Sequence, residues 1–162
     1  MDWKSFFSFR GRINRAKYWL VLLILIIAEI ILRGIHFLVE QGWDVVTEQA
    51  PEDSIAGLVT LVIVSLVVLA ISLTLFVAGL AAAIKRLHDR DKSAWWLLVF
   101  YLLPGVLAVT GAGVSWATES WVALGLLGAA AFGISIWAFI ELGCLRGTQG
   151  VNRYGPDPLA NG

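Results

Sequence analysis

The stretch from residue 55 to residue 84 reads IAGLVTLVIVSLVVLAISLTLFVAGLAAAI and contains no charged residue. A helix needs about 20 apolar residues to cross a hydrocarbon core about 30 Å thick, so this stretch is long enough to span a membrane. Strands of an outer-membrane barrel are shorter and alternate apolar with polar residues, and that alternation is absent here. The stretch therefore predicts a transmembrane helix.

Three further apolar stretches lie outward from it, at about residues 18–39, 94–114 and 121–145. The chain is 59% hydrophobic and 15% charged, whereas soluble domains have about 45–50% apolar and about 25% charged residues. No polar linker divides the chain. We therefore predict an all-α polytopic membrane protein in which residues 1–162 form one domain with four transmembrane helices. A kink is expected at Pro104 in the third span.

The first apolar stretch follows several basic residues, as the core of a secretory signal peptide does. It is longer than the 7–15 residues of such a core, and no small-residue cleavage site follows it. We expect it to be retained as the first span.

Basic residues indicate the orientation of the chain. Lysine and arginine gather in residues 1–17, 85–93 and 146–162, whereas residues 41–54 carry acidic residues and no basic one. Short loops rich in lysine and arginine stay in the cytoplasm, so both termini are expected there. Tryptophans near the expected span ends support the boundaries, because indole prefers the headgroup layer; they are Trp19, Trp43, Trp95, Trp96, Trp116 and Trp121.

Three polar segments on the expected cytoplasmic face are residues 9–19, 85–96 and 147–158. If a helix begins near Asn14, Arg12 and Arg15 share one face and point into the phosphate layer. In the second segment Arg86 is expected to pair with Asp89, and Asp91 or Ser93 to cap the third span. Glycine, asparagine and proline in the third segment predict turns that fold back over the helix ends.

These segments resemble the DUF805 family of small bacterial inner-membrane proteins, whose name stands for domain of unknown function. The resemblance rests on three blocks: Gly11-Arg12 with Arg15 and Tyr18-Trp19; Arg86-Leu87-His88-Asp89 with Ser93 and Trp95-Trp96; and Gly147 with residues 152–158, NRYGPDP. It implies a location in the bacterial inner membrane and supplies no activity. The family often has glycine on both sides of the basic–serine pair in the middle block, where this chain has Asp91 and Ala94.

The expected cytoplasmic face also holds the candidate ligand-binding residues. Guanidinium groups make bidentate contacts with phosphate, so a pocket for an anionic lipid, a phosphate-bearing ligand or a membrane partner is one interpretation. The other is that the arginines only enforce topology and are satisfied by the interspersed aspartates. The candidates are Arg12, Arg15, Arg86, His88, Asp89, Asn152 and Arg153.

The pair His88-Asp89 also suggests a lipid-headgroup enzyme, since a carboxylate often orients a catalytic imidazole. No nucleophile or set of metal ligands accompanies it, so we name no catalytic residue and expect neither a metal nor a cofactor. A hydrogen-bonded structural role for His88 is favoured.

Ionisable residues also lie inside the first span. Glu29, Arg33, His36 and Glu40 are spaced by four, three and four residues and form one helical stripe. Residues of this kind indicate proton or ion handling by default, so a small transporter or channel is the alternative function. Pairing of Glu29 with Arg33 is the simpler interpretation. Near the end of the fourth span, Glu141 is expected to meet an arginine of the first or second polar segment.

Partners follow from the same composition. Membrane lipids, in particular anionic ones, are expected, and a homo-oligomer or a membrane-protein partner is a further possibility. Small residues of the fourth span allow close contact either with the first span of the same chain or with another copy; they are Gly125, Gly128 and Gly133. No nucleic-acid module is visible. The single cysteine, Cys144, excludes an internal disulfide.

Overall fold

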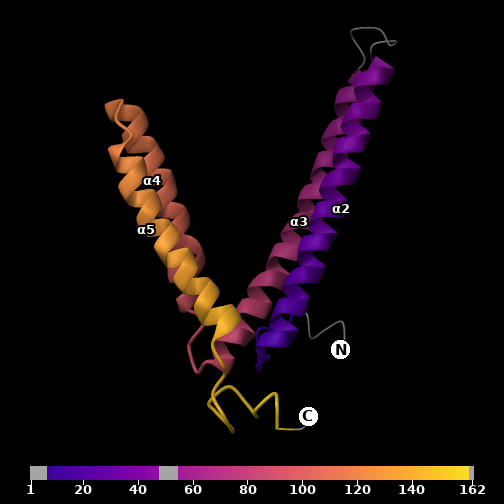
Figure 1. Cartoon of the computed structure of the whole chain (residues 1–162). Helices are drawn as coiled ribbons and strands as arrows, with labels where there is room; N and C mark the ends of the chain where they lie inside the picture. Colours follow the sequence, from indigo (N-terminus) through magenta and orange to yellow (C-terminus); the bar gives the residue numbers. More distant parts are fainter. Residues whose placement is uncertain (1–6, 48–54, 161–162) are drawn as a thin grey trace. The chain divides into compact units, whose positions relative to one another are not determined.

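The computed structural model describes residues 7–47 and 55–160 and is helical throughout its membrane segments (Figure 1). Among these residues, four helical segments are long and apolar enough to cross a membrane, which confirms the all-α, four-span prediction. The elements are α2 (Arg15–Thr47), α3 (Ile55–Asp89), η1 (Leu98–Leu102), α4 (Leu103–Thr118), α5 (Val122–Phe139) and η2 (Ile140–Cys144). The two η elements are π-helical turns that run on into α4 and out of α5.

Helices α2 and α3 are longer than the predicted spans, whereas the third helical segment, Leu98–Thr118, is shifted toward the C-terminus and the fourth, Val122–Cys144, lies within its predicted span. The helix α2 begins at Arg15, because the Asn14 Oδ1 accepts the backbone N–H of Lys17 at 2.8 Å and so caps the first turn. It continues to Thr47, and α3 continues through the charged residues to Asp89. Helix α4 reaches Thr118 and ends where Glu119 adopts a left-handed conformation with φ 52°. Composition marks the hydrocarbon part of a helix and not its polar ends.

Chain contacts divide the molecule into two compact units. The first, which we call the terminal unit, comprises Met1–Trp19 and Ala81–Gly162; the second, the α2–α3 unit, comprises Leu20–Leu80. The expectation of one domain stays a prediction. Lys4 and the acidic residues Glu48, Glu52 and Asp53 lie outside the described residues, as do the side chains of Trp43 and Asp44.

In the α2–α3 unit two antiparallel helices meet through polar pairs in an otherwise apolar interface. Ser72 donates to both carboxylate oxygens of Glu29, at 3.1 and 3.2 Å. Two helical turns further along α2, His36 Nε2 lies 3.4 Å from Ser65 Oγ. The two pairs lie seven residues apart along each helix, as expected for antiparallel helices that remain in contact. Many large apolar side chains on the outer faces are exposed, which suits hydrocarbon and not water.

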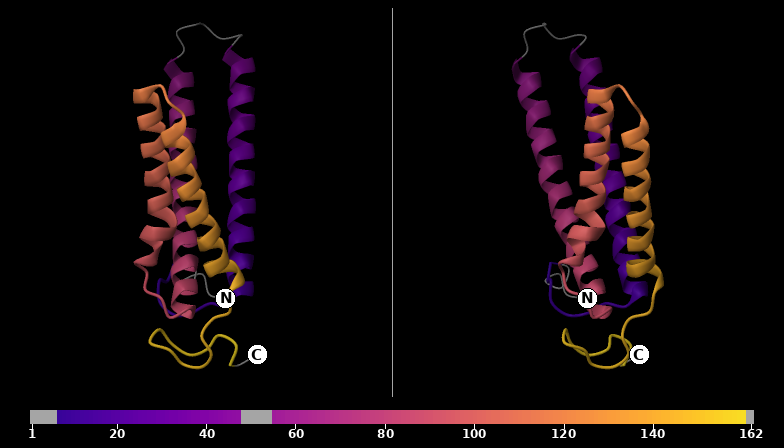
Figure 2. Two further views of the ribbon diagram at one scale, coloured as in Figure 1. Left: turned by 60° about the vertical axis from the view of Figure 1, so that its left-hand side comes forward. Right: turned by 90° about the vertical axis from the view of Figure 1, so that its left-hand side faces the viewer.

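In the terminal unit α4 and α5 form an antiparallel hairpin (Figure 2). A Cβ at Gly111 would lie only 3.2 Å from Leu124 Cα, so glycine allows the helices to approach here. A Cβ added at Gly125, Gly128 or Gly133 would meet no other group among the described residues within 4 Å, so their use in close packing stays a prediction. The Ser115 hydroxyl accepts the Leu124 N–H at 2.9 Å and ties the hairpin near its turn.

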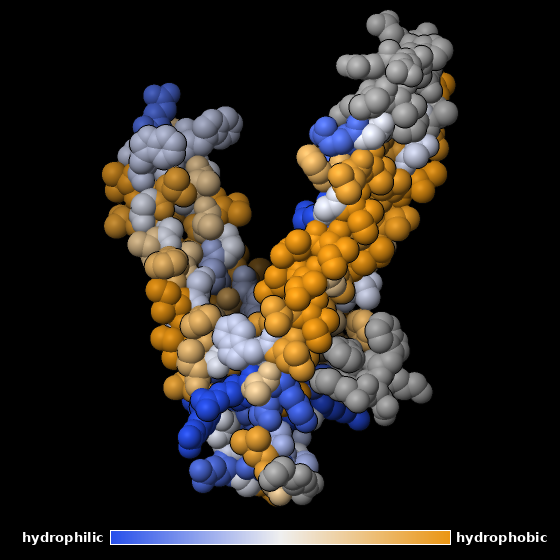
Figure 3. Space-filling model, turned by 45° about the vertical axis from the view of Figure 1, so that its right-hand side comes forward, coloured by the Kyte–Doolittle hydropathy of each residue, from blue (hydrophilic) through white to orange (hydrophobic). Residues whose placement is uncertain are grey.

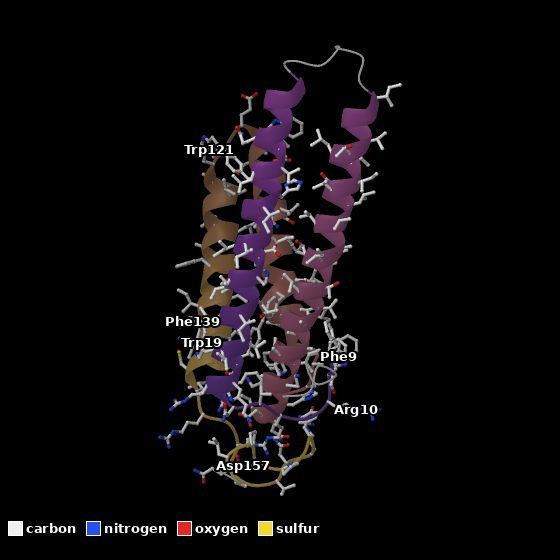
Figure 4. The ribbon with its side chains drawn as sticks, turned by 90° about the vertical axis from the view of Figure 1, so that its right-hand side faces the viewer. Phe9, Arg10, Trp19, Trp121, Phe139 and Asp157 are labelled. Carbon is white, nitrogen blue, oxygen red and sulfur yellow. The ribbon has the colours of Figure 1, made fainter. Side chains whose placement is uncertain are left out.

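The described tryptophans fall near the helix ends, as expected. Trp116 and Trp121 flank the α4–α5 turn and are 88% and 80% exposed, whereas Trp19 and Phe139 pack together at the opposite end of the terminal unit (Figure 4). On the face shown in Figure 3, a hydrophilic patch lies at the lower end of the molecule, and the helix surfaces above it are mainly hydrophobic. The polar end of the terminal unit is therefore where a site is to be sought.

Candidate functional site

The three polar segments meet at one end of the terminal unit. The first leads into α2, the second contains the end of α3, and the third follows η2 and passes beneath the helix ends (Figure 2). Thr148 anchors the third segment, since both its backbone N–H and its hydroxyl donate to the Asp89 carbonyl, at 2.8 and 3.1 Å. The prediction that the tail folds back over the helices is confirmed.

Asp89 lies at the centre of this arrangement between two arginines. Arg12 Nε donates to Asp89 Oδ1 at 3.1 Å, and Arg86 Nη1 donates to Oδ2. All three side chains are at most 4% exposed. We call Arg12, Arg86 and Asp89 the polar hub. Its pairing is expected to be essential, because removing one partner of a buried ion pair costs about 3–5 kcal/mol.

Arg12 joins the hub to the tail. Its terminal nitrogens donate to the carbonyls of Thr148, Gly150 and Gly155 at 2.5, 2.7 and 3.2 Å. Arg12 lies before α2 and not within it, so it does not share a helical face with Arg15. The guanidinium that was expected to point into the phosphate layer instead organises three turns of the same chain.

The end of η2 presents its free carbonyls to side chains of the other two segments. A helix leaves its last carbonyls without helical partners, and cations or N–H groups stabilise them. Here every carbonyl from residue 142 to residue 146 accepts such a donor: Leu142 and Leu145 from Arg86, Gly143 from Trp19, Cys144 from Arg15, and Arg146 from Arg90. This helix end is therefore fixed by side chains of the first and second polar segments.

Two glycines permit these close approaches. A Cβ at Gly147 would collide with the Asp89 carboxylate, and a Cβ at Gly143 would collide with the Trp19 indole. The carboxylate has no room to move, because Arg12 and Arg86 hold it on both sides. Gly147 belongs to the motif noted in the sequence, and its role is to let the tail lie directly on Asp89.

His88 is bonded and stacked within the site. Its Nδ1 lies 3.3 Å from the Gly11 carbonyl oxygen, and its ring stacks on Tyr154 with centroids 3.9 Å apart and planes 5° apart. It is 9% exposed. Groups of three or more potential metal ligands are absent from the part of the chain that the structure describes. The arrangement supports a structural role for His88.

Asn152 and Arg153 hold the tail against the middle segment. The Asn152 amide donates to the His88 carbonyl and to Thr148 Oγ1, both at 2.9 Å. Arg153 pairs with Asp91 at 3.1 Å and lies over the Tyr154 ring. Asp91 adopts φ 54°, a left-handed conformation that glycine prefers, so here an aspartate occupies the left-handed position of the turn. No side-chain cap bond from Asp91 or Ser93 is found at the start of η1.

Glu141 forms a second ion-pair group beside the hub. Its Oε1 lies 3.0 Å from Arg90 Nε and 3.1 Å from Lys92 Nζ, which confirms the expected pairing with an arginine of the second segment. The Lys92 ammonium also lies 4.4 Å from the ring centroid of Trp96. The ion pair between Lys92 and Glu141 was not predicted, because the sequence does not show which basic residue of the turn lies near Glu141.

A cleft of about 340 Å³ opens beside the hub. Its floor includes Arg86 and Asp89, and its rim includes Arg15 and Arg146, which are exposed. Arg146 has no side-chain hydrogen bond or ion pair within residues 7–47 and 55–160, and Arg15 has a single long bond of 3.4 Å. The remaining lining residues are Asn14, Gly147, Thr148, Gln149, Asp157 and Leu159.

Asp157 is the second carboxylate of the cleft. The backbone N–H groups of Leu159 and Gly150 donate to its two oxygens at 2.9 and 3.0 Å, and these bonds lower the pKa of its carboxyl group. Three guanidinium groups and two carboxylates line the cleft, so its formal charge is 3 − 2 = +1. Arg146 and Gln149 are not among the candidate residues predicted from the sequence, because no motif or spacing marks them.

The ionisable stripe of α2 belongs to the other unit. Glu29 pairs with Arg33 at 2.9 Å, as expected, and also accepts two bonds from Ser72. His36 lies 3.6 Å from Glu40. The pairing satisfies Glu29 within the α2–α3 unit, and the transport alternative stays a prediction.

Sequence comparison places these features in a family. The family described as "Protein of unknown function (DUF805)" matches residues 6–156, which include all three polar segments. The chain belongs to the DUF805 family. The Escherichia coli K12 protein named inner membrane protein YhaH is 29% identical over 98% of this chain and 97% of its own length. Inner membrane protein YhaI of the same organism is 30% identical over 96% of this chain and 89% of its own.

The DUF805 relatives and the four apolar helices together identify an integral inner-membrane protein. A third relative, uncharacterized protein YiiR of Escherichia coli K12, is 35% identical over 48% of this chain. No solved structure matches the chain. The hub and the cleft of this DUF805 member are therefore interpreted from their own geometry.

Proposed function

We propose that this protein binds anionic phospholipid in the cytoplasmic leaflet, with the phosphate held by Arg15 and Arg146 at the rim of the cleft. The supporting observation is that these two exposed guanidinium groups line a positively charged cleft beside the polar hub. Guanidinium groups bind phosphate oxygens bidentately, and a rigid site loses less entropy when its ligand binds.

The predicted ligand-binding residues take different parts in this proposal. Arg12 and Arg86 donate their hydrogen bonds to Asp89 and to backbone carbonyls, so their role is to hold the lining of the cleft in place. His88, Asn152 and Arg153 hold the tail that forms one wall. Arg15 is the residue of the original set that faces the ligand, and Arg146 joins it.

The cytoplasmic location of the site is part of the proposal. Both chain ends belong to the terminal unit, and the basic residues of all three segments lie at its polar end. Loops rich in lysine and arginine remain cytoplasmic, and anionic lipids attract them. The cleft adjoins the ends of α2 and η2, where a phospholipid headgroup lies.

Native mass spectrometry of the gently extracted full chain tests the proposal. We expect the wild type to retain anionic phospholipid and Arg15→Gln/Arg146→Gln to lose it, with binding weakened at least about tenfold, because two charge-assisted hydrogen-bond donors are removed. Arg10→Gln is the matched control, since Arg10 is exposed at the same end but does not line the cleft (Figure 4). Equal lipid retention by the double variant and the control would overturn the proposal.

A further inference from the structure

The polar groups of the cleft that lack partners are not all cations. The Asn14 carboxamide uses its oxygen to cap α2, and within residues 7–47 and 55–160 neither its NH₂ nor the exposed Gln149 carboxamide makes a side-chain hydrogen bond. Both line the same cleft as Arg15 and Arg146. Elsewhere in the three segments, the amide of Asn152 and the guanidinium groups of Arg12 and Arg86 are bonded.

The cleft also offers an acceptor. Each Asp157 oxygen accepts one backbone N–H and has a further lone pair, and Asp157 lines the cleft with Gln149. A ligand that is only a phosphate would face this carboxylate with like charge. A ligand that also carries hydroxyl groups would donate to Asp157 and to the carboxamide oxygen of Gln149.

We propose that the cleft is selective for a phosphate ester whose headgroup carries free hydroxyl groups, as in phosphatidylglycerol: Arg15 and Arg146 bind the phosphate, and Asp157, Gln149 and Asn14 bind the hydroxyls. The inference rests on the proposed function, because it assigns the headgroup of the same site. A volume of about 340 Å³ leaves room for more than a phosphate group. Leu159, 65% exposed, adds an apolar side chain to the lining of the cleft.

A zwitterionic headgroup fits less well. The ammonium group of phosphatidylethanolamine would pair with Asp157, but it would enter a cleft whose formal charge is already +1, with two guanidinium groups at its rim. Neutral hydroxyls satisfy the carboxylate and the amides without that repulsion. Phosphatidate satisfies the arginines and leaves the amides unused.

The test titrates the delipidated full chain with phosphatidylglycerol, phosphatidate and phosphatidylethanolamine of identical acyl chains and measures each dissociation constant by native mass spectrometry. We expect phosphatidylglycerol to bind most tightly. Gln149→Ala removes a side chain without internal bonds, so folding is retained. It should weaken phosphatidylglycerol binding about three- to tenfold, as for one or two neutral hydrogen bonds, and leave phosphatidate binding unchanged.

The outcomes separate this inference from the proposed function. If Arg15→Gln/Arg146→Gln weakens binding of both anionic lipids but Gln149→Ala changes neither, the phosphate site stands and the headgroup inference is wrong. If the arginine variant changes nothing, both are wrong. Tightest binding of phosphatidylethanolamine would also overturn the inference.

A soluble probe distinguishes a lipid from a free ligand. Competition with sn-glycero-3-phospho-1-glycerol, which has the same phosphodiester and glycerol hydroxyls but no acyl chains, should not displace phosphatidylglycerol if the acyl chains contribute to affinity. If the soluble compound displaces phosphatidylglycerol at a comparable concentration, the site binds a soluble phosphate ester. That result would contradict the proposal of a lipid ligand but would support the hydroxyl-bearing headgroup.

Discussion

At the residue scale, Asp89 accounts for how the three polar segments meet. One carboxylate fixes two arginines, and those arginines then bond to carbonyls of the tail and of η2. The pairing of Arg86 with Asp89 was predictable, because residues three apart on a helix are neighbours. The pairing of Arg12 with Asp89 was not, since no local rule connects residues 77 positions apart.

Gly147→Ala tests the closeness of the tail to Asp89. The new methyl group would overlap the buried carboxylate, and we expect unfolding to become easier by about 1–3 kcal/mol, the usual cost of overpacking. Thermal unfolding in detergent, followed by tryptophan fluorescence, measures the change. Gly128→Ala is the control, because nothing lies near its Cβ position and alanine favours a helix. Equal midpoints for the two variants would contradict the assigned role of Gly147.

At the scale of elements, apolar length predicted the spans but not their ends. The span of α3 was evident from thirty residues without charge, whereas its continuation to Asp89 depends on partners supplied by other segments. The π-helical turn η2 had no signal in the sequence. It ends the fourth helix with carbonyls that have no helical partner, and these carbonyls accept the donors of Arg86 and Trp19.

The turn around Asp157 should be sensitive to acid. Its pKa lies below the ordinary value because the Leu159 and Gly150 amides favour the charged carboxylate. The carboxylate therefore stabilises the folded turn at pH above about 4, and this contribution is lost as the pH falls through the lowered pKa.

Amide hydrogen exchange or nuclear magnetic resonance shifts of Gly150 and Leu159 measure this loss. Asp157→Asn should remove the dependence on pH in this range. Unchanged protection of both amides in the wild type down to pH 2 would argue against the turn geometry.

At the scale of the whole molecule, four spans among the described residues predict that both termini lie on the same side of the membrane, and both terminal segments belong to the terminal unit. The side of the membrane follows from the positive charges and is testable. In a Cys144→Ala background, Val151→Cys should react with a membrane-impermeant maleimide in inverted vesicles, and Thr118→Cys in intact spheroplasts. Both positions are exposed, at the tail and at the α4–α5 turn. The reverse pattern would place the cleft on the outer face.

The contacts of Arg12 also set an order of events during synthesis. The carbonyls that it binds are 136–143 residues further along the chain, so at about 5–20 residues per second the ribosome supplies them about 7–29 s after Arg12. Until then Arg12 lacks these three acceptors, so the contacts that join Arg12 to the tail form only after the last helical turn, η2, has been made.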